Sequence, residues 1–103
     1  DLHTGAAVLM FIIRKNIKKR EQKMMKKYEN KTNVIGELIK KKREEKGLSK
    51  AALSRKLELH AVYISPTALN KMETNRMIIK DFELIGLTKV LQIDYADLQN
   101  TIE

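Results

Sequence analysis

Apolar residues recur at every third or fourth position from Val34 to the end of the chain, as they do along amphipathic helices. The apolar stripes are separated by residues that start or stop helices, among them Gly47, Ser49 and Ser65. This punctuation predicts five short helices with short connections, and therefore an all-α domain over residues 34–103. The expected helices span about 33–46, 49–57, 65–74, 81–91 and a short stretch that starts at Asp94 and is supported by Asp97.

The first 33 residues form a different kind of segment, which we treat as an N-terminal extension. Ala6–Ile13 is apolar on all sides, and the strongly basic tract Arg14–Lys27 follows it. Since no proline interrupts the segment, we expect one helix from about Gly5 to Glu29. An all-round apolar helix must be buried, so we expect the extension to contact another copy of the chain.

The extension also allows other interpretations. Its apolar run is far shorter than the roughly 20 residues that cross a bilayer, and its basic tract follows the run, unlike that of a secretory signal. We therefore reject a signal peptide and keep an interfacial membrane anchor only as a minor alternative. An alternative takes Met24-Met25 as the natural start, so that residues 1–23 lie upstream of the native protein.

Composition limits the functional classes. A chain of 103 residues supports one small domain, and the absence of cysteine excludes disulfides and thiolate metal sites and favours the cytoplasm. His3 and His60 are far apart and have no acidic cluster at metal spacing, and no catalytic constellation or phosphate loop appears. We therefore expect neither an enzyme nor a cofactor.

The positive charge is unevenly distributed along the chain. The net charge is +8 overall, with +6 in residues 1–33, +5 in residues 34–77 and −3 in residues 78–103. The predicted domain is thus basic in its first half and acidic at its C-terminal end. Such polarity suits a polyanionic partner, although charge alone does not distinguish DNA from RNA or an anionic membrane.

Two of the predicted helices have the layout of a helix-turn-helix. The second begins with Ser65 as its N-cap and Pro66 at its first position, a strong helix-start signal. With its apolar residues turned inward, this helix presents Thr67, Asn70 and Lys71 outward. In a helix-turn-helix, such a second helix enters the major groove of DNA.

Three stretches of the chain then resemble the XRE, or lambda-repressor-like, helix-turn-helix family. Ile35-Gly36 through Leu57 resembles the family's opening helices, Ile64–Glu73 its recognition helix and Glu83–Ile93 its closing helices. The resemblance covers residues 34 to about 98 and implies a five-helix lambda-repressor-like DNA-binding domain. It departs from the family in the longer connection Glu58–Tyr63 and in Thr74-Asn75, which replaces the usual Asn-Gly stop.

The resemblance also implies roles for individual residues. Ser49 and Lys50 begin the helix that meets the DNA backbone in the family. On the recognition helix, side-chain chemistry allows Asn70 to pair bidentately with adenine, Lys71 to donate to guanine and Thr67 to pack on a thymine methyl. Pro66 stands where members often have a polar contact residue, whereas Arg43 and Glu73 resemble a structural pair. The expected DNA-binding residues are Ser49, Lys50, Ser65, Thr67, Asn70, Lys71 and Arg76.

These features lead us to expect a sequence-specific regulator of transcription, a repressor, that binds double-stranded DNA as a homodimer. The rival expectation is a protein-interaction module with the same fold, such as the antitoxin half of a toxin–antitoxin pair. Val62, Ile78 and Ile79 are the apolar residues that such a module would expose to its protein partner. A third interpretation gives the extension a role in binding RNA or membrane.

Overall fold

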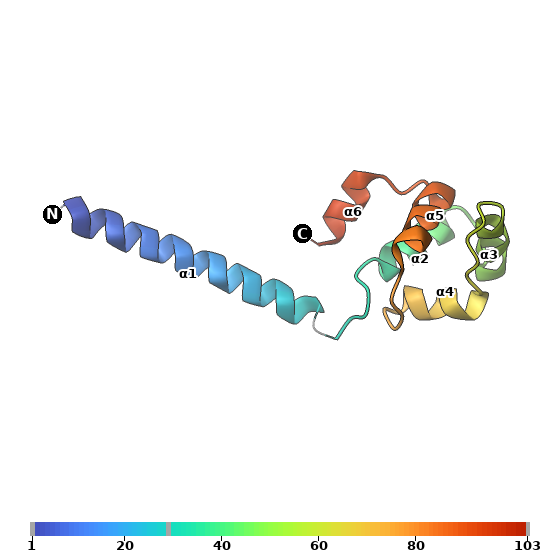
Figure 1. Ribbon diagram of the computed structural model, residues 1–103, viewed down its shortest axis with the longest axis horizontal. Helices are drawn as coiled ribbons and strands as arrows, with labels where there is room; N and C mark the ends of the chain where they lie inside the picture. The colour runs from blue at the N-terminus through green and yellow to red at the C-terminus, as the bar shows by residue number, and fades with distance from the viewer. Residues whose placement is uncertain (1, 29, 103) are drawn as a thin grey trace. The chain divides into compact units, whose positions relative to one another are not determined.

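The described part of the chain is entirely helical. The computed structural model describes the backbone of residues 2–28 and 30–102, and the side chains of residue 5 and of residues 7–19 and 30–102. These residues form six helices and no strand, which confirms the all-α prediction. The chain divides into one unit that ends at Asn30 and a second that starts at Lys31 (Figure 1).

The first unit consists of the helix α1, Leu2–Tyr28. The single helix expected for the extension is therefore present, although its predicted end at Glu29 lies outside the described residues. Six consecutive apolar side chains, Val8 to Ile13, are each 43–66% exposed on this helix. No helix among the described residues has the length and apolar character needed to cross a membrane.

The second unit contains the five helices expected from the sequence. Within it, α4 packs against α2 and α3, and α5 packs against the same two helices (Figure 1). The helices are α2 (Gly36–Glu45), α3 (Lys50–Glu58), α4 (Pro66–Glu73), α5 (Asp81–Leu91) and α6 (Tyr95–Thr101).

The predicted caps define three of these helix starts. The Ser49 hydroxyl oxygen accepts a hydrogen bond from the Ala52 N–H (3.0 Å), and Ser65 does the same for Ala68 (3.1 Å). At α6, Asp94 and Asp97 exchange side-chain-to-backbone bonds of 2.8 and 3.1 Å. These bonds satisfy N–H groups that have no partner within the first turn of a helix.

The core is formed by the apolar stripes of α2 to α5. It closes over the connection between α3 and α4, where Val62 and Ile64 are also buried. The fully buried side chains are Ile39, Leu53, Leu57, Leu69, Met72, Leu87 and Leu91.

The burial of Val62 corrects an expectation. We expected Val62 on an exposed protein-binding surface, but it is only 7% exposed. It lies against α5 at Gly86, where an added Cβ would come within 2.7 Å of a Val62 methyl group. Of the other two residues expected there, Ile78 is 66% exposed and Ile79 is half-buried.

The helix α2 begins at Gly36, about three residues later than predicted, and Asn33 lies before it with bonds both to the start of α2 and to the end of α4. Its side-chain oxygen accepts from the Gly36 N–H (2.9 Å), and its side-chain N–H2 donates to the carbonyls of Met72 and Met77 (2.9 and 2.8 Å). Asn75 donates back to the Asn33 carbonyl at 3.1 Å. These bonds tie the start of α2 to the end of α4.

Candidate DNA interface

The helix α4 has one buried side and one exposed side. Leu69, Met72 and Glu73 are buried, whereas Thr67 and Lys71 are exposed and Asn70 is half-buried. The helical spacing of the inward residues therefore places the outward ones as expected from the sequence. Pro66 occupies the first helical position after its cap, Ser65.

The beginning of α3 lies beside the middle of α4. The Lys50 ammonium donates a hydrogen bond to the side-chain oxygen of Asn70 at 2.9 Å. Ser49, next to Lys50, is exposed, and its hydroxyl still carries a proton to donate after capping the helix. The structure thus brings three of the candidate residues together from two helices.

The end of α4 holds the last candidate residue. The Arg76 Nε donates to the Thr74 hydroxyl oxygen (2.9 Å), and that hydroxyl donates to the Asn70 carbonyl (2.8 Å). Arg76 is exposed, so its terminal guanidinium nitrogens are accessible to an anion. Arg76 therefore lies just beyond Lys71 on the same end of α4.

The chain turns at Asn75 to leave α4. Asn75 has a φ of 62°, in the left-handed region that asparagine tolerates better than most residues. Thr74-Asn75 therefore ends the helix as the sequence predicted.

The long connection between α3 and α4 is a turn held together by hydrogen bonds. The N–H groups of His60 and Val62 both donate to the Leu57 carbonyl, at 2.9 and 3.1 Å. The buried Ser54 hydroxyl donates to the Ile64 carbonyl at 2.6 Å. These bonds and the burial of Val62 fix where α4 begins relative to α3.

A buried ion pair fixes the other end of α4. The Arg43 guanidinium donates to both carboxylate oxygens of Glu73 at 2.8 Å, and also to the Leu48 carbonyl at 2.8 Å. The hydrogen bond to Glu73 raises the pKa of Arg43 above its ordinary value, so Arg43 keeps its charge. The expected structural pair is therefore present.

Sequence reasoning missed the contact between Lys50 and Asn70. Each residue was assigned its own target on DNA, because nothing in the spacing of two positions on different helices indicates a contact. Only the crossing of α3 and α4 brings the two side chains together.

Comparison with known proteins identifies the family. The family model described as helix-turn-helix, of the XRE-like type, matches residues 39–98, which span α3, α4 and α5 together with most of α2 and α6. The comparisons with curated proteins and with solved structures found no match. The matched region covers more than half of the chain and contains the α3–α4 site described above. The chain belongs to the XRE-like helix-turn-helix family of DNA-binding proteins.

Proposed function

We propose that this protein is a sequence-specific transcriptional repressor with α4 as its recognition helix. The observation that carries the proposal is the two-sided character of α4. Its inner side is held by Leu69, Met72 and the Glu73 ion pair, and its outer side presents Thr67 and Lys71. An α-helix held in this way fits the major groove of B-DNA, where base edges are distinguishable.

The remaining candidates suit the phosphate backbone. Ser49 and Lys50 start α3, where a hydroxyl, an ammonium group and helix N-terminal amides favour a phosphate oxygen. Ser65 stands at the start of α4, and Arg76 lies beyond its end. We assign these residues to positioning on DNA, and Thr67, Asn70 and Lys71 to base reading.

We further propose that the protein acts as a homodimer on a two-fold related operator. Repeated half-sites one helical turn apart are the usual target of paired helix-turn-helix domains. The exposed apolar side chains Val8 to Ile13 on α1 support a contact between copies through this helix. Light scattering of the full chain and of residues 24–103 tests the dimer. A full chain that is monomeric at micromolar concentration would refute the α1 contact.

Selection of binding sites from random double-stranded DNA tests the main proposal. The full chain and residues 24–103 should enrich the same sequence, because the candidate residues all lie in the second unit. Asn70→Ala and Lys71→Ala should each weaken binding to the selected site by about 1–3 kcal/mol. Each should also relax the base preference at one position of that site. If the full chain enriches no sequence, or both variants bind as the wild type does, α4 is not a recognition helix.

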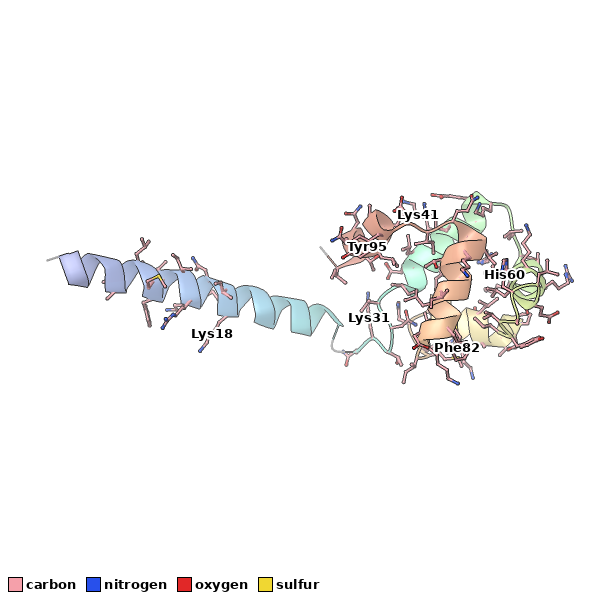
Figure 2. All side chains as sticks on the ribbon, turned by 45° about the horizontal axis from the view of Figure 1, so that its top comes forward. Lys18, Lys31, Lys41, His60, Phe82 and Tyr95 are labelled. Carbon is pink, nitrogen blue, oxygen red and sulfur yellow. The ribbon has the colours of Figure 1, made fainter. Side chains whose placement is uncertain are left out.

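A second candidate function is an antitoxin-like protein-interaction module. Ile78 is 66% exposed, and Phe82 and Ile85 of α5 are 53% and 55% exposed, so this region offers apolar surface to a protein (Figure 2 labels Phe82). Co-purification with the product of a neighbouring gene for a small protein would favour this function. If Ile78→Lys and Phe82→Lys leave that co-purification unchanged, the surface is not the binding site.

A further inference from the structure

The hydrogen bond between Lys50 and Asn70 fixes the orientation of the Asn70 amide. An ammonium group has donors only, so the Asn70 atom 2.9 Å from it must be the carbonyl oxygen Oδ1. Among the described residues, no protein group accepts a hydrogen bond from the Asn70 Nδ2. The amide N–H2 is therefore left to bind something outside the protein.

This orientation is unfavourable for the adenine pairing that an asparagine commonly makes. That pairing requires Oδ1 to accept from adenine N6 while Nδ2 donates to N7. Oδ1 keeps a second lone pair, but an adenine N6–H2 approaching it would bring positive hydrogens beside the Lys50 ammonium. Oδ1 in this protein is thus an acceptor already taken by a cation.

Guanine has the complementary chemistry. Its major-groove edge carries two acceptors, N7 and O6, and no donor. With its Oδ1 engaged by Lys50, the Asn70 side chain presents only the donors of Nδ2, and the adjacent ammonium group adds no acceptor. A thymine edge has one acceptor and a methyl group, and a cytosine edge has a donor, so neither matches such a group as well.

We propose that Lys50 and Asn70 read DNA as one donor-only unit that selects guanine. Lys50 acts as a positioning residue that removes the acceptor of Asn70, and Asn70 makes the base contact. The inference rests on the proposed function of α4 and specifies which base one of its residues selects. It replaces the adenine pairing expected from the sequence.

Binding-site selection with a set of variants tests this specificity. Asn70→Ala should relax a single position in each half-site and thereby identify the base that Asn70 contacts. We expect guanine at that position for the wild type, and adenine for Lys50→Met, whose Asn70 regains a free Oδ1. Lys56→Met, which removes one charge from the exposed part of the same helix, should keep guanine.

The outcomes separate this inference from the proposed function. If the wild type enriches no sequence, α4 does not read DNA and both proposals fail. If the wild type is specific but has adenine at the Asn70 position, or if Lys50→Met keeps guanine there, only the donor-only unit is wrong.

A modified base provides a second test that does not depend on Lys50→Met remaining folded. Replacing the guanine by 7-deazaguanine removes the N7 acceptor without altering base pairing. Binding of the wild type should weaken by about fivefold or more, and binding of Asn70→Ala should not change. Equal loss for both proteins, or no loss for either, would overturn the proposed contact.

Discussion

The Arg43 guanidinium and the Glu73 carboxylate form a two-bond ion pair that joins α2 to the end of α4. Both N–O distances are 2.8 Å, and the two side chains are only 10% and 2% exposed. Arg43 also holds the Leu48 carbonyl in the connection before α3. One guanidinium therefore links α2, the entry to α3 and the proposed recognition helix.

Removing either partner of this pair should destabilise the fold strongly. Arg43→Met leaves the buried Glu73 carboxylate without its counter-charge, which costs about 3–5 kcal/mol, and Glu73→Gln leaves Arg43 only the more distant Glu44 carboxylate at 3.9 Å. Chemical denaturation monitored by circular dichroism measures the loss. The ion pair between Lys31 and the exposed Glu37 is the control, since Glu37→Gln should cost less than about 1 kcal/mol.

The double variant Arg43→Met with Glu73→Leu distinguishes ion pairing from packing. With both charges removed, no buried group lacks a partner except the Leu48 carbonyl, so the double variant should be more stable than either single variant. Additive losses in the double variant would mean that the pair contributes through shape rather than charge.

Asn75 should tolerate glycine better than alanine. Both substitutions lose the Asn75 hydrogen bonds to Asn33, which contribute about 1 kcal/mol. Alanine is also disfavoured at the left-handed φ of 62°, which costs roughly another 1–2 kcal/mol. Urea denaturation of both variants measures this difference. Equal losses would show that the turn relaxes out of the left-handed conformation.

Local sequence signals predicted most of the fold. Ser49, Ser65 and Asp94 start helices through bonds to N–H groups three residues away, so their roles depend only on nearby sequence. The exposure of Thr67 and Lys71 follows from the helical spacing of the buried residues on α4. The sequence of a single helix and its cap is therefore enough to determine these features.

The features that were missed depend on distant parts of the chain. Val62 lies in a connection where apolar residues do not recur at helical spacing. Its burial depends on Gly86, which has no side chain and so leaves room for it. Asn33 lies at the predicted boundary between the extension and the domain, yet its bonds reach Met72, Asn75 and Met77. No local pattern indicates such contacts, because they arise only when the helices pack.

Alanine at position 36 should disrupt the packing of α2 on α4. An added Cβ at Gly36 would lie 2.2 Å from the Met72 carbonyl oxygen, which is backbone and has little freedom to move. Forced overpacking of this kind costs about 1–3 kcal/mol, which thermal unfolding measures as a lower melting temperature. Gly5→Ala on α1 is the control, since nothing lies within 4 Å of its added Cβ. An unchanged melting temperature for Gly36→Ala would contradict this close approach.

The stability contributed by Asp97 should disappear in acid. The hydrogen bond from the Asp94 N–H, together with the Lys42 ammonium 3.4 Å away, lowers the pKa of Asp97 below its ordinary value. A carboxylate with a lowered folded pKa stabilises the fold above its unfolded pKa, and this contribution is lost as the pH falls through the folded value.

Asp97→Asn should therefore lower the melting temperature at pH 7 and have less effect as the pH falls below about 4. The matched control is Glu58→Gln, which removes one negative charge from the exposed end of α3. A melting-temperature difference for Asp97→Asn that stays constant from pH 7 to pH 2 would show that its charge does not stabilise α6.

Arg76 should contribute to DNA affinity without contributing to sequence preference. Its Nε is held by Thr74 beyond the end of α4, which leaves the exposed terminal nitrogens for a phosphate oxygen. Loss of one phosphate contact weakens binding to selected and unrelated sequences alike, and it reduces the slope of log affinity against log salt concentration by about one. Titrations of Arg76→Ala at several salt concentrations measure both effects.

Lys41→Ala removes the same charge from an exposed position on α2 and should leave the slope unchanged (Figure 2 labels Lys41). A loss confined to the selected sequence would instead make Arg76 a base-reading residue, because phosphate contacts carry no sequence information.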